Sequence, residues 1–223
     1  MDKHHTCALT HEELMSMEQS LRVNVINSIL GFKSVALIGS INDKKESNLA
    51  IFSSIVHLGA SPPLIGLVVR PDCVDRHTLT NIMETASFTI NHINENIMQQ
   101  AHQTSARYPK EISEFDATQL TEEYKGNCKA PFVKESHIQM AVSFREKHEL
   151  SINACQFVIG EIQAIYFPKE CFCVDGFIDI EKAQSITCSG LDRYHRTQHL
   201  ARLSYAKVDK NLSSQKLEYK YST

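Results

Sequence analysis

The sequence has no surplus of basic residues, few glycines and prolines, and no long hydrophobic run. Lys and Arg number 23 against 26 Asp and Glu, so the net charge is −3 at pH 7. Binding to nucleic acid or to an anionic membrane surface is driven by a basic surplus, which this chain lacks. The apolar runs at 34–41 and 64–69 have the length of strands and are too short to span a membrane. We therefore expect no nucleic-acid partner and no membrane association.

Cysteine and histidine patterns give no support for a disulfide framework or a metal site. The seven cysteines are an odd number, are widely scattered and contain no C-x-x-C pair. Cys171 and Cys173 flank Phe172 and could be a metal or redox pair, but a strand or loop edge explains them as well. His195 and His199 have helical spacing without a third ligand in view. With no signal peptide visible, we expect a reduced cytoplasmic protein without a metal.

Four common catalytic motifs are absent. The chain contains no G-x-G-x-x-G, no G-x-x-x-x-G-K-[ST], no H-E-x-x-H and no G-x-S-x-G. These absences remove the usual sequence support for a Rossmann dinucleotide site, a P-loop, a zinc protease and a serine hydrolase. No catalytic acid–base residue can be assigned from the sequence.

The amino-terminal segment 1–31 is predicted to be a helical extension. Thr10 and Glu13 form a capping box, and apolar residues recur at helical spacing until Gly31. This pattern predicts one helix that packs on the domain that follows it. The polar, lysine-dotted segment 207–223 is predicted to be an exposed tail.

Between these ends, short apolar segments alternate with turn-forming residues. Strands are predicted at 34–41, 48–57, 64–69, 87–93, 138–144 and 157–167. Helices are predicted at 78–84, with Thr78 as its cap, and near 95–104. Hydrophobic residues make up 42% of the chain, which is enough for a packed core. We predict one domain, 1–223, that is mainly β with helical additions and forms a small barrel.

Polar residues at the predicted strand and helix ends suggest a site for an anion and a ring. Ser40 ends the first strand, Asn48 begins the next, and Arg76 precedes the helix that carries Thr78. Arginine and a helix start suit a phosphate, whereas Ser and Asn beside apolar residues suit a heteroaromatic ring. A polar strand edge, a solvated charge and a helix cap explain the same residues without any ligand.

Several short motifs occur together in a specific order. They are Val35-Ala-Leu-Ile, Asn48-Leu-Ala-x-x-Ser53, Pro62-Pro63-Leu-Ile, Arg76-x-Thr78-x-x-Asn81-Ile82, Phe88-Thr-Ile-Asn, Glu114-Phe115 and Phe157-Val-Ile-Gly-Glu-Ile162. Across residues 33–206 this order resembles the flavin reductase-like family, which has the FMN-binding split β-barrel fold of Greek-key type. His77 departs from the family pattern, in which an acidic residue is frequent at that place.

The resemblance implies a set of cofactor-binding residues. Those expected near the flavin ring are Ser40, Ile41, Asn48, Leu49 and Ala50. Those expected near the ribityl chain and the phosphate are Ser53, Ser54, Arg76 and Thr78. Further candidates are Asn81, to hold the helix start, and Tyr194, His195 and Tyr205, to line the ring.

The resemblance also implies an activity and a partner. It implies an FMN-binding oxidoreductase that transfers hydride from NADH or NADPH to the flavin, and a homodimer. In such an enzyme the cofactor supplies the chemistry, which accounts for the missing acid–base pair. The alternatives are a non-catalytic FMN carrier or flavin-sensing protein on the same barrel, and an enzyme similar to pyridoxamine-phosphate oxidase.

Overall fold

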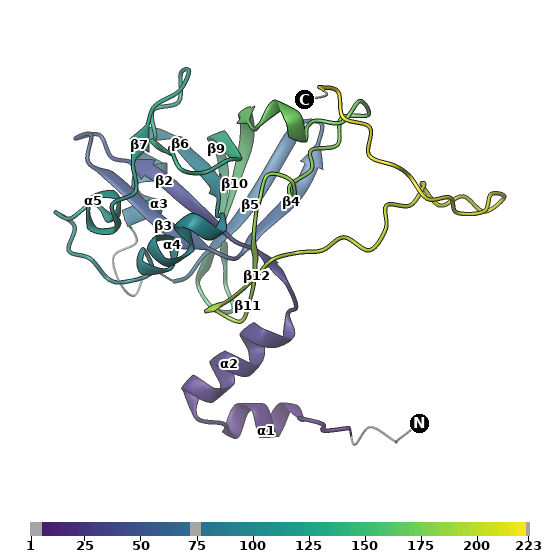
Figure 1. Ribbon diagram of the computed structural model, residues 1–223. Helices are drawn as coiled ribbons and strands as arrows, with labels where there is room; N and C mark the ends of the chain where they lie inside the picture. Colours follow the sequence, from purple (N-terminus) through teal and green to yellow (C-terminus); the bar gives the residue numbers. More distant parts are fainter. Residues whose placement is uncertain (1–5, 72–76, 222–223) are drawn as a thin grey trace.

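One antiparallel sheet of seven strands dominates the computed structural model, which describes residues 6–71 and 77–221 (Figure 1). The strand order is β3-β2-β6-β9-β10-β5-β4. The strands are β2 (Ala36–Ile41), β3 (Ser47–Phe52), β4 (Ile55–Ala60), β5 (Pro63–Val69), β6 (Ser87–His92), β9 (Gln139–Leu150) and β10 (Cys155–Tyr166). Because β3 and β4 are consecutive in the chain but lie at opposite edges, the sheet curls into a barrel that is split between them. The predicted mainly β fold with short helices is confirmed.

Two smaller sheets and several short helices complete the fold. The strands β1 (Lys33–Ser34), β11 (Thr187–Ser189) and β12 (Arg193–His195) form one sheet, in the order β1-β11-β12. The second sheet pairs β7 (Glu122–Glu123) with β8 (Phe132–Val133). The helices beside the barrel are α3 (His77–Thr85), α4 (Met98–Gln103), α5 (Glu114–Thr118) and the 3₁₀ turns η1 (Glu95–Ile97) and η2 (Lys169–Cys171).

Two apolar clusters lie on the two faces of β2. Side chains alternate between the faces of a strand, so Ile38 joins Leu79 and Ile82 of α3, whereas Leu37 joins Leu49 and residues of α4 and α5. All six positions of β2 are buried because both of its faces are covered. This strand therefore anchors the elements on either side of it.

Gly39 permits a close approach inside this core. A Cβ atom at Gly39 would lie 2.2 Å from the Pro131 carbonyl oxygen and 2.5 Å from Thr89 Oγ1. No larger residue fits there without moving the backbone.

The amino-terminal helix differs from its prediction in two ways. The capping box at Thr10 is confirmed, but the segment forms two helices, α1 (His11–Ser16) and α2 (Gln19–Ile29). The chain is extended at Met17, and the Glu18 carboxylate accepts hydrogen bonds from the first amides of α2, so the helix restarts there. The predicted packing on the domain is wrong, because neither helix has a buried residue.

The predicted strand 48–57 is also wrong, because the segment contains two strands, β3 and β4. Ser54 lies between them. Its carbonyl accepts a hydrogen bond from the Val68 amide at 3.1 Å, and its hydroxyl donates to the Val68 carbonyl at 2.9 Å. These hydrogen bonds hold the bend where the chain passes from β3, at one edge of the sheet, to β4, at the other.

The carboxy-terminal segment is largely exposed, but its end returns to the barrel. The Val174 amide donates to the Glu218 carbonyl at 2.8 Å, and the Tyr219 hydroxyl donates to Asp179 at 2.7 Å. Residues 207–216 of the predicted exposed tail are exposed, and the chain after them is attached to the barrel by these two hydrogen bonds. None of the helices within 6–71 and 77–221 is both long and apolar enough to cross a membrane.

Candidate functional site

Strand β3 places the predicted residues on alternate sides. Asn48 and Ala50 share one face, which is the face covered by α3, whereas Leu49 points into the opposite cluster. Asn48 is paired in register with Ser40 of β2. The two-residue alternation of this strand therefore points the Asn48 side chain toward the start of α3.

Two buried hydrogen bonds join α3 to the sheet. Asn48 Nδ2 donates to Thr78 Oγ1 at 3.0 Å, and Asn81 Nδ2 donates to Ser40 Oγ at 3.2 Å. All four side chains are buried. Thr78 is the second residue of α3 rather than its cap, and Asn81 contacts the sheet rather than holding the helix start, which corrects both predictions.

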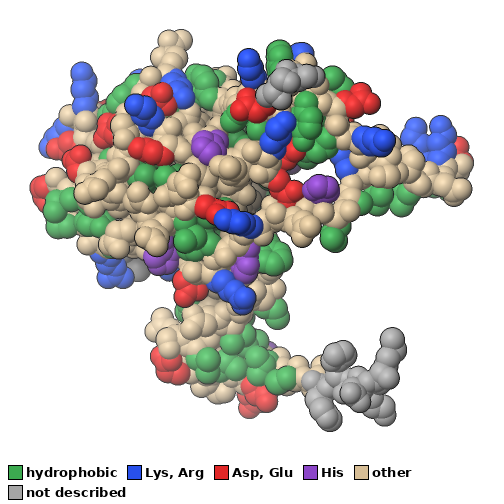
Figure 2. All heavy atoms as spheres, viewed as in Figure 1, with side chains coloured by type: hydrophobic (Ala, Val, Ile, Leu, Met, Phe, Trp, Pro, Cys, Tyr) green, Lys and Arg blue, Asp and Glu red, His purple; other side chains and the backbone are tan. Residues whose placement is uncertain are grey.

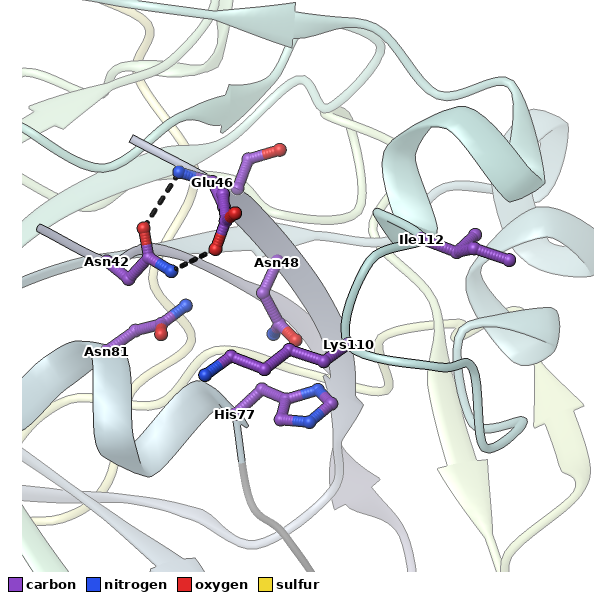
Figure 3. A pocket seen from close by; sticks show the side chains of 8 residues that line it. Asn42, Glu46, Asn48, His77, Asn81, Lys110 and Ile112 are labelled. Carbon is purple, nitrogen blue, oxygen red and sulfur yellow. Dashed lines mark hydrogen bonds between the residues drawn. The ribbon is translucent and has the colours of Figure 1, made fainter. Parts of the chain in front are cut away.

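A shallow surface depression, open to solvent and with an enclosed volume of only about 10 Å³, lies beside this junction (Figure 3). We call it the amide pocket, and its lining residues are Asn42, Glu46, Ser47, Asn48, His77, Asn81, Lys110 and Ile112. They come from the β2–β3 turn, from β3, from α3 and from the loop that precedes α5. The pocket thus gathers four segments that are far apart in the sequence.

The β2–β3 turn holds one wall of the pocket in place. Asn42 Nδ2 donates to the Glu46 carboxylate at 2.6 Å, while Asn42 Oδ1 accepts from the amides of Lys44 and Glu46 at 3.0 and 2.8 Å. The Glu46 carboxylate is therefore already engaged within the turn.

The pocket also contains one lysine and one histidine side chain. The side chains of Lys110 and His77 lie side by side in the pocket (Figure 3). Neither forms a hydrogen bond or ion pair with any residue that the structure describes. With two buried amides behind them, they offer donors to an anionic group. Sequence reasoning missed Lys110, because residues 105–113 are a polar loop without periodicity or a motif.

Glu114 supports β3 from behind the pocket. Its carboxylate is buried and accepts a hydrogen bond from the Leu49 amide at 2.9 Å. Burial raises the pKa of Glu114, and the hydrogen bond from Leu49 and the nearby His77 oppose that rise. This carboxylate caps a backbone amide on the edge of β3 that has no neighbouring strand.

The remaining predicted site residues fall into two groups. Ile41 and Leu49 are buried near the amide pocket, and Ala50 is half-buried on the open edge of β3. Ser53 and Ser54 follow the other end of β3, at most about 17 and 20 Å from Asn48 at about 3.3 Å per residue. Arg76 lies outside the described residues.

The carboxy-terminal aromatic candidates are not brought to the pocket. The Tyr194 hydroxyl bonds His102 Nδ1 at 2.9 Å, and its ring packs on the cluster that contains Leu37. His195 Nε2 bonds Ser189 Oγ at 2.8 Å. Tyr205 is 88% exposed in the carboxy-terminal loop. Within the described part of the chain, no three His, Cys, Asp or Glu side chains converge as a metal site.

Comparisons with known proteins show the family and the fold of the chain. The family model described as "Flavin reductase like domain" matches residues 32–172. A solved split-barrel structure from Shewanella frigidimarina NCIMB 400, titled as a candidate flavin reductase, is 47% identical, with a TM-score of 0.87 over 90% of this chain and 100% of that chain. The predicted split-barrel fold is confirmed by this likeness.

Two further relatives are more distant. Nitrilotriacetate monooxygenase component B from Bacillus cereus has the same fold, with 20% identity and a TM-score of 0.79 over 90% of this chain and 100% of that chain. An uncharacterized protein of Aquifex aeolicus (strain VF5) is 27% identical over 108 residues, which are 48% of this chain. The match spans about half the length of that protein, 55%.

Proposed function

The chain belongs to the flavin reductase like domain family, and from this premise we propose that it binds FMN and transfers hydride from NADH or NADPH to it. The observation that carries the proposal is the unengaged pair Lys110 and His77 beside the buried amides of Asn48 and Asn81. A phosphate monoester needs cations and N–H donors within reach, and this group supplies both. The donor chemistry of the pocket therefore fits the phosphate end of FMN.

Arg76 and Thr78 complete the proposed phosphate site. Arg76 immediately precedes His77 in the chain, where α3 begins. A hydrogen bond from Arg to a charged partner contributes roughly 1.5–3 kcal/mol, so Arg76→Ala should weaken FMN binding about 10- to 150-fold. Riboflavin lacks the phosphate and serves as the matched ligand, whose affinity should change much less. Equal losses for both ligands would mean that Arg76 supports the fold instead.

The open edge of β3 is proposed to hold the ring. Ala50 is half-buried on that edge and shares its face with the buried polar side chain of Asn48, which pairs in register with Ser40, whereas Ile41 and Leu49 are buried and would support the strand beneath the ring. Ser53 and Ser54 extend the contact toward the far end of the strand. Bound flavin supplies the redox chemistry, and these residues orient it and limit its contact with water.

The proposed homodimer is supported by the exposed sheet edges. Strands β3 and β4 end the seven-stranded sheet, and Val56 and Leu58 of β4 are largely exposed. Unpaired edges and apolar faces of this kind are commonly covered by a second subunit. Light scattering should give about twice the chain mass of 25.2 kDa. A mass near 25.2 kDa at micromolar concentration would contradict the dimer.

Steady-state oxidation of NADH and NADPH in the presence of added FMN tests the activity itself. The proposal predicts turnover that depends on both protein and flavin. The test variant is Lys110→Ala, which removes the pocket lysine without altering a hydrogen bond between described residues and should raise the FMN concentration that turnover requires. Turnover that does not depend on added or bound flavin would contradict the proposal.

A further inference from the structure

Two segments, one near each end of the chain, extend away from the barrel (Figure 1). The first, which we call the N-terminal arm, is residues 6–32 and contains α1 and α2. The second, the C-terminal arm, is residues 203–217. Figure 2 shows hydrophobic and acidic side chains on the N-terminal arm and Lys side chains at the far end of the C-terminal arm. Most side chains of both arms are exposed.

The N-terminal arm cannot be stable through its own contacts. A helix of 11 residues, the length of α2, is marginal in water unless an apolar face is covered. Neither α1 nor α2 contains a buried residue. The largely exposed apolar side chains of the arm include Met15, Leu21, Ile26, Ile29, Leu30 and Phe32. The helix therefore requires a surface that a single subunit does not provide.

The C-terminal arm has the same property. Its backbone pairs within the arm through the Ser204 amide, which donates to the Ser213 carbonyl at 2.9 Å, and through two isolated bridges, and the Gln215 amide donates to the carbonyl of Arg202 just before the arm at 2.7 Å. Its exposed apolar side chains are Leu203, Tyr205, Val208 and Leu212. An isolated hairpin of this size is likewise marginal in water.

The arms carry opposite charges. The N-terminal arm has Glu12, Glu13 and Glu18 against a single Arg22, which gives −2. The C-terminal arm has Lys207, Lys210 and Lys216 against a single Asp209, which gives +2. None of these three lysines forms an ion pair with any residue in 6–71 or 77–221. The two arms therefore suit each other in charge as well as in exposed apolar surface.

Both arms also start from the same place in the fold. The N-terminal arm joins the three-stranded sheet at β1, and the chain that leads to the C-terminal arm leaves it at β12. Phe32 and His195 mark these two exits, and their rings contact each other with centroids 4.9 Å apart. The two arms of one chain diverge from this sheet and do not cover each other (Figure 1), so a second copy would have to supply the covering arm.

We propose that the N-terminal arm of one copy packs on the C-terminal arm of a second copy of this chain, and the reverse, so that two arm contacts clasp the dimer. This inference rests on the proposed homodimer, and it adds which segments form the contact. The exposed face of α2 supplies the apolar surface, and the glutamates of α1 face the lysines of the hairpin.

Cross-linking a mixture of ¹⁵N-labelled and unlabelled full-length protein tests the contact between the two arms. Equal amounts of unlabelled and ¹⁵N-labelled protein are mixed, equilibrated and treated with a carbodiimide, which joins carboxylates to nearby lysines. Cross-links between Glu12 or Glu13 and Lys207, Lys210 or Lys216 should occur in mixed-isotope pairs. Their absence, or their occurrence only within one labelled chain, would overturn the proposal.

A substitution on α2 tests the energy of the contact. Ile26→Glu places a charge on an exposed position of α2, so the barrel does not depend on it. Because the dimer contains the contact twice, its dissociation constant should rise about 100-fold or more. The matched control is Ile152→Glu, at a residue that is 91% exposed in the β9–β10 turn, and it should leave the dimer intact.

The same samples separate this inference from the proposed function. Sedimentation gives the oligomeric state, circular dichroism the fold, and FMN fluorescence the cofactor affinity. A dimer that persists unchanged in Ile26→Glu overturns the arm contact and leaves the homodimer standing. A wild-type monomer overturns both, whereas loss of FMN binding in a wild-type dimer overturns only the flavin proposal.

Discussion

Glu114 offers a sharp test of how the open edge of β3 is held. Its buried carboxylate accepts the Leu49 amide at 2.9 Å, on an edge where no strand of the sheet follows. Glu114→Ala leaves that amide buried without an acceptor. An unsatisfied buried N–H group costs about 1–3 kcal/mol. For a domain of 150–250 residues this lowers the unfolding temperature by about 2–12 °C.

Glu114→Gln separates the hydrogen bond from the charge. Glutamine retains a carbonyl acceptor for Leu49 but cannot ionise. Burial raises the pKa of Glu114, so the folded protein holds its proton to higher pH than the unfolded chain does. The free energy of unfolding should therefore fall as pH rises above about 4.5, through the raised pKa, and Glu114→Gln should lack this fall.

Thermal and urea unfolding of both variants, followed by circular dichroism, measure these effects. Glu111→Ala, on the exposed loop before α5, is the matched control and should match the wild type. The reasoning fails if Glu114→Ala is as stable as the wild type. It also fails if Glu114→Gln is as damaging as Glu114→Ala at pH 7, because the acceptor would then be irrelevant.

Three further predictions concern the core and the junction of β3 with α3. Asn48→Ala removes the 3.0 Å hydrogen bond to Thr78 and should lower the free energy of unfolding in urea by about 1–3 kcal/mol. A fluorescence titration should also show weaker FMN binding, and an unchanged affinity would mean that the ligand binds elsewhere. Gly39→Ala puts a Cβ 2.2 Å from the Pro131 oxygen and should cost at least about 1–3 kcal/mol in the same assay, and a neutral effect would refute the close approach. Burial lowers the pKa of His92 to about 4, so the unfolded chain binds more protons than the folded protein between pH 6.5 and 4. The free energy of unfolding should therefore fall by about 2–3 kcal/mol as the pH drops through that window. His92→Gln should flatten this part of the pH profile, and an unchanged profile would contradict the assignment.

Local patterns in the sequence predict most strands of the seven-stranded sheet, but not the short strands β1, β7, β8, β11 and β12. Two-residue alternation and turn residues such as Pro62 and Pro63 mark the strands correctly, because both signals act over a few neighbouring residues. The bend at Ser54 has no Gly or Pro to signal it. It depends on hydrogen bonds to Val68, 14 positions away, which no local pattern reveals.

The candidate site was only partly predictable for the same reason. Asn48 and Thr78 were expected at one site, and the structure joins them directly although they are 30 positions apart. Lys110 reaches the pocket from a loop whose path depends on the packing of α5, and nothing in its neighbouring residues marks it. The predicted packing of the amino-terminal helix on the barrel failed because an amphipathic pattern shows that a face needs cover without showing what covers it.

Anaerobic mixing of the FMN-loaded protein with NADH or NADPH tests the central claim most directly. The flavin absorbance at about 450 nm reports its oxidation state. The account predicts that the purified protein binds FMN and that one of the two nucleotides bleaches this band faster than it bleaches free FMN. A protein that binds no FMN, or one whose bound flavin keeps its absorbance with both nucleotides, would contradict the account.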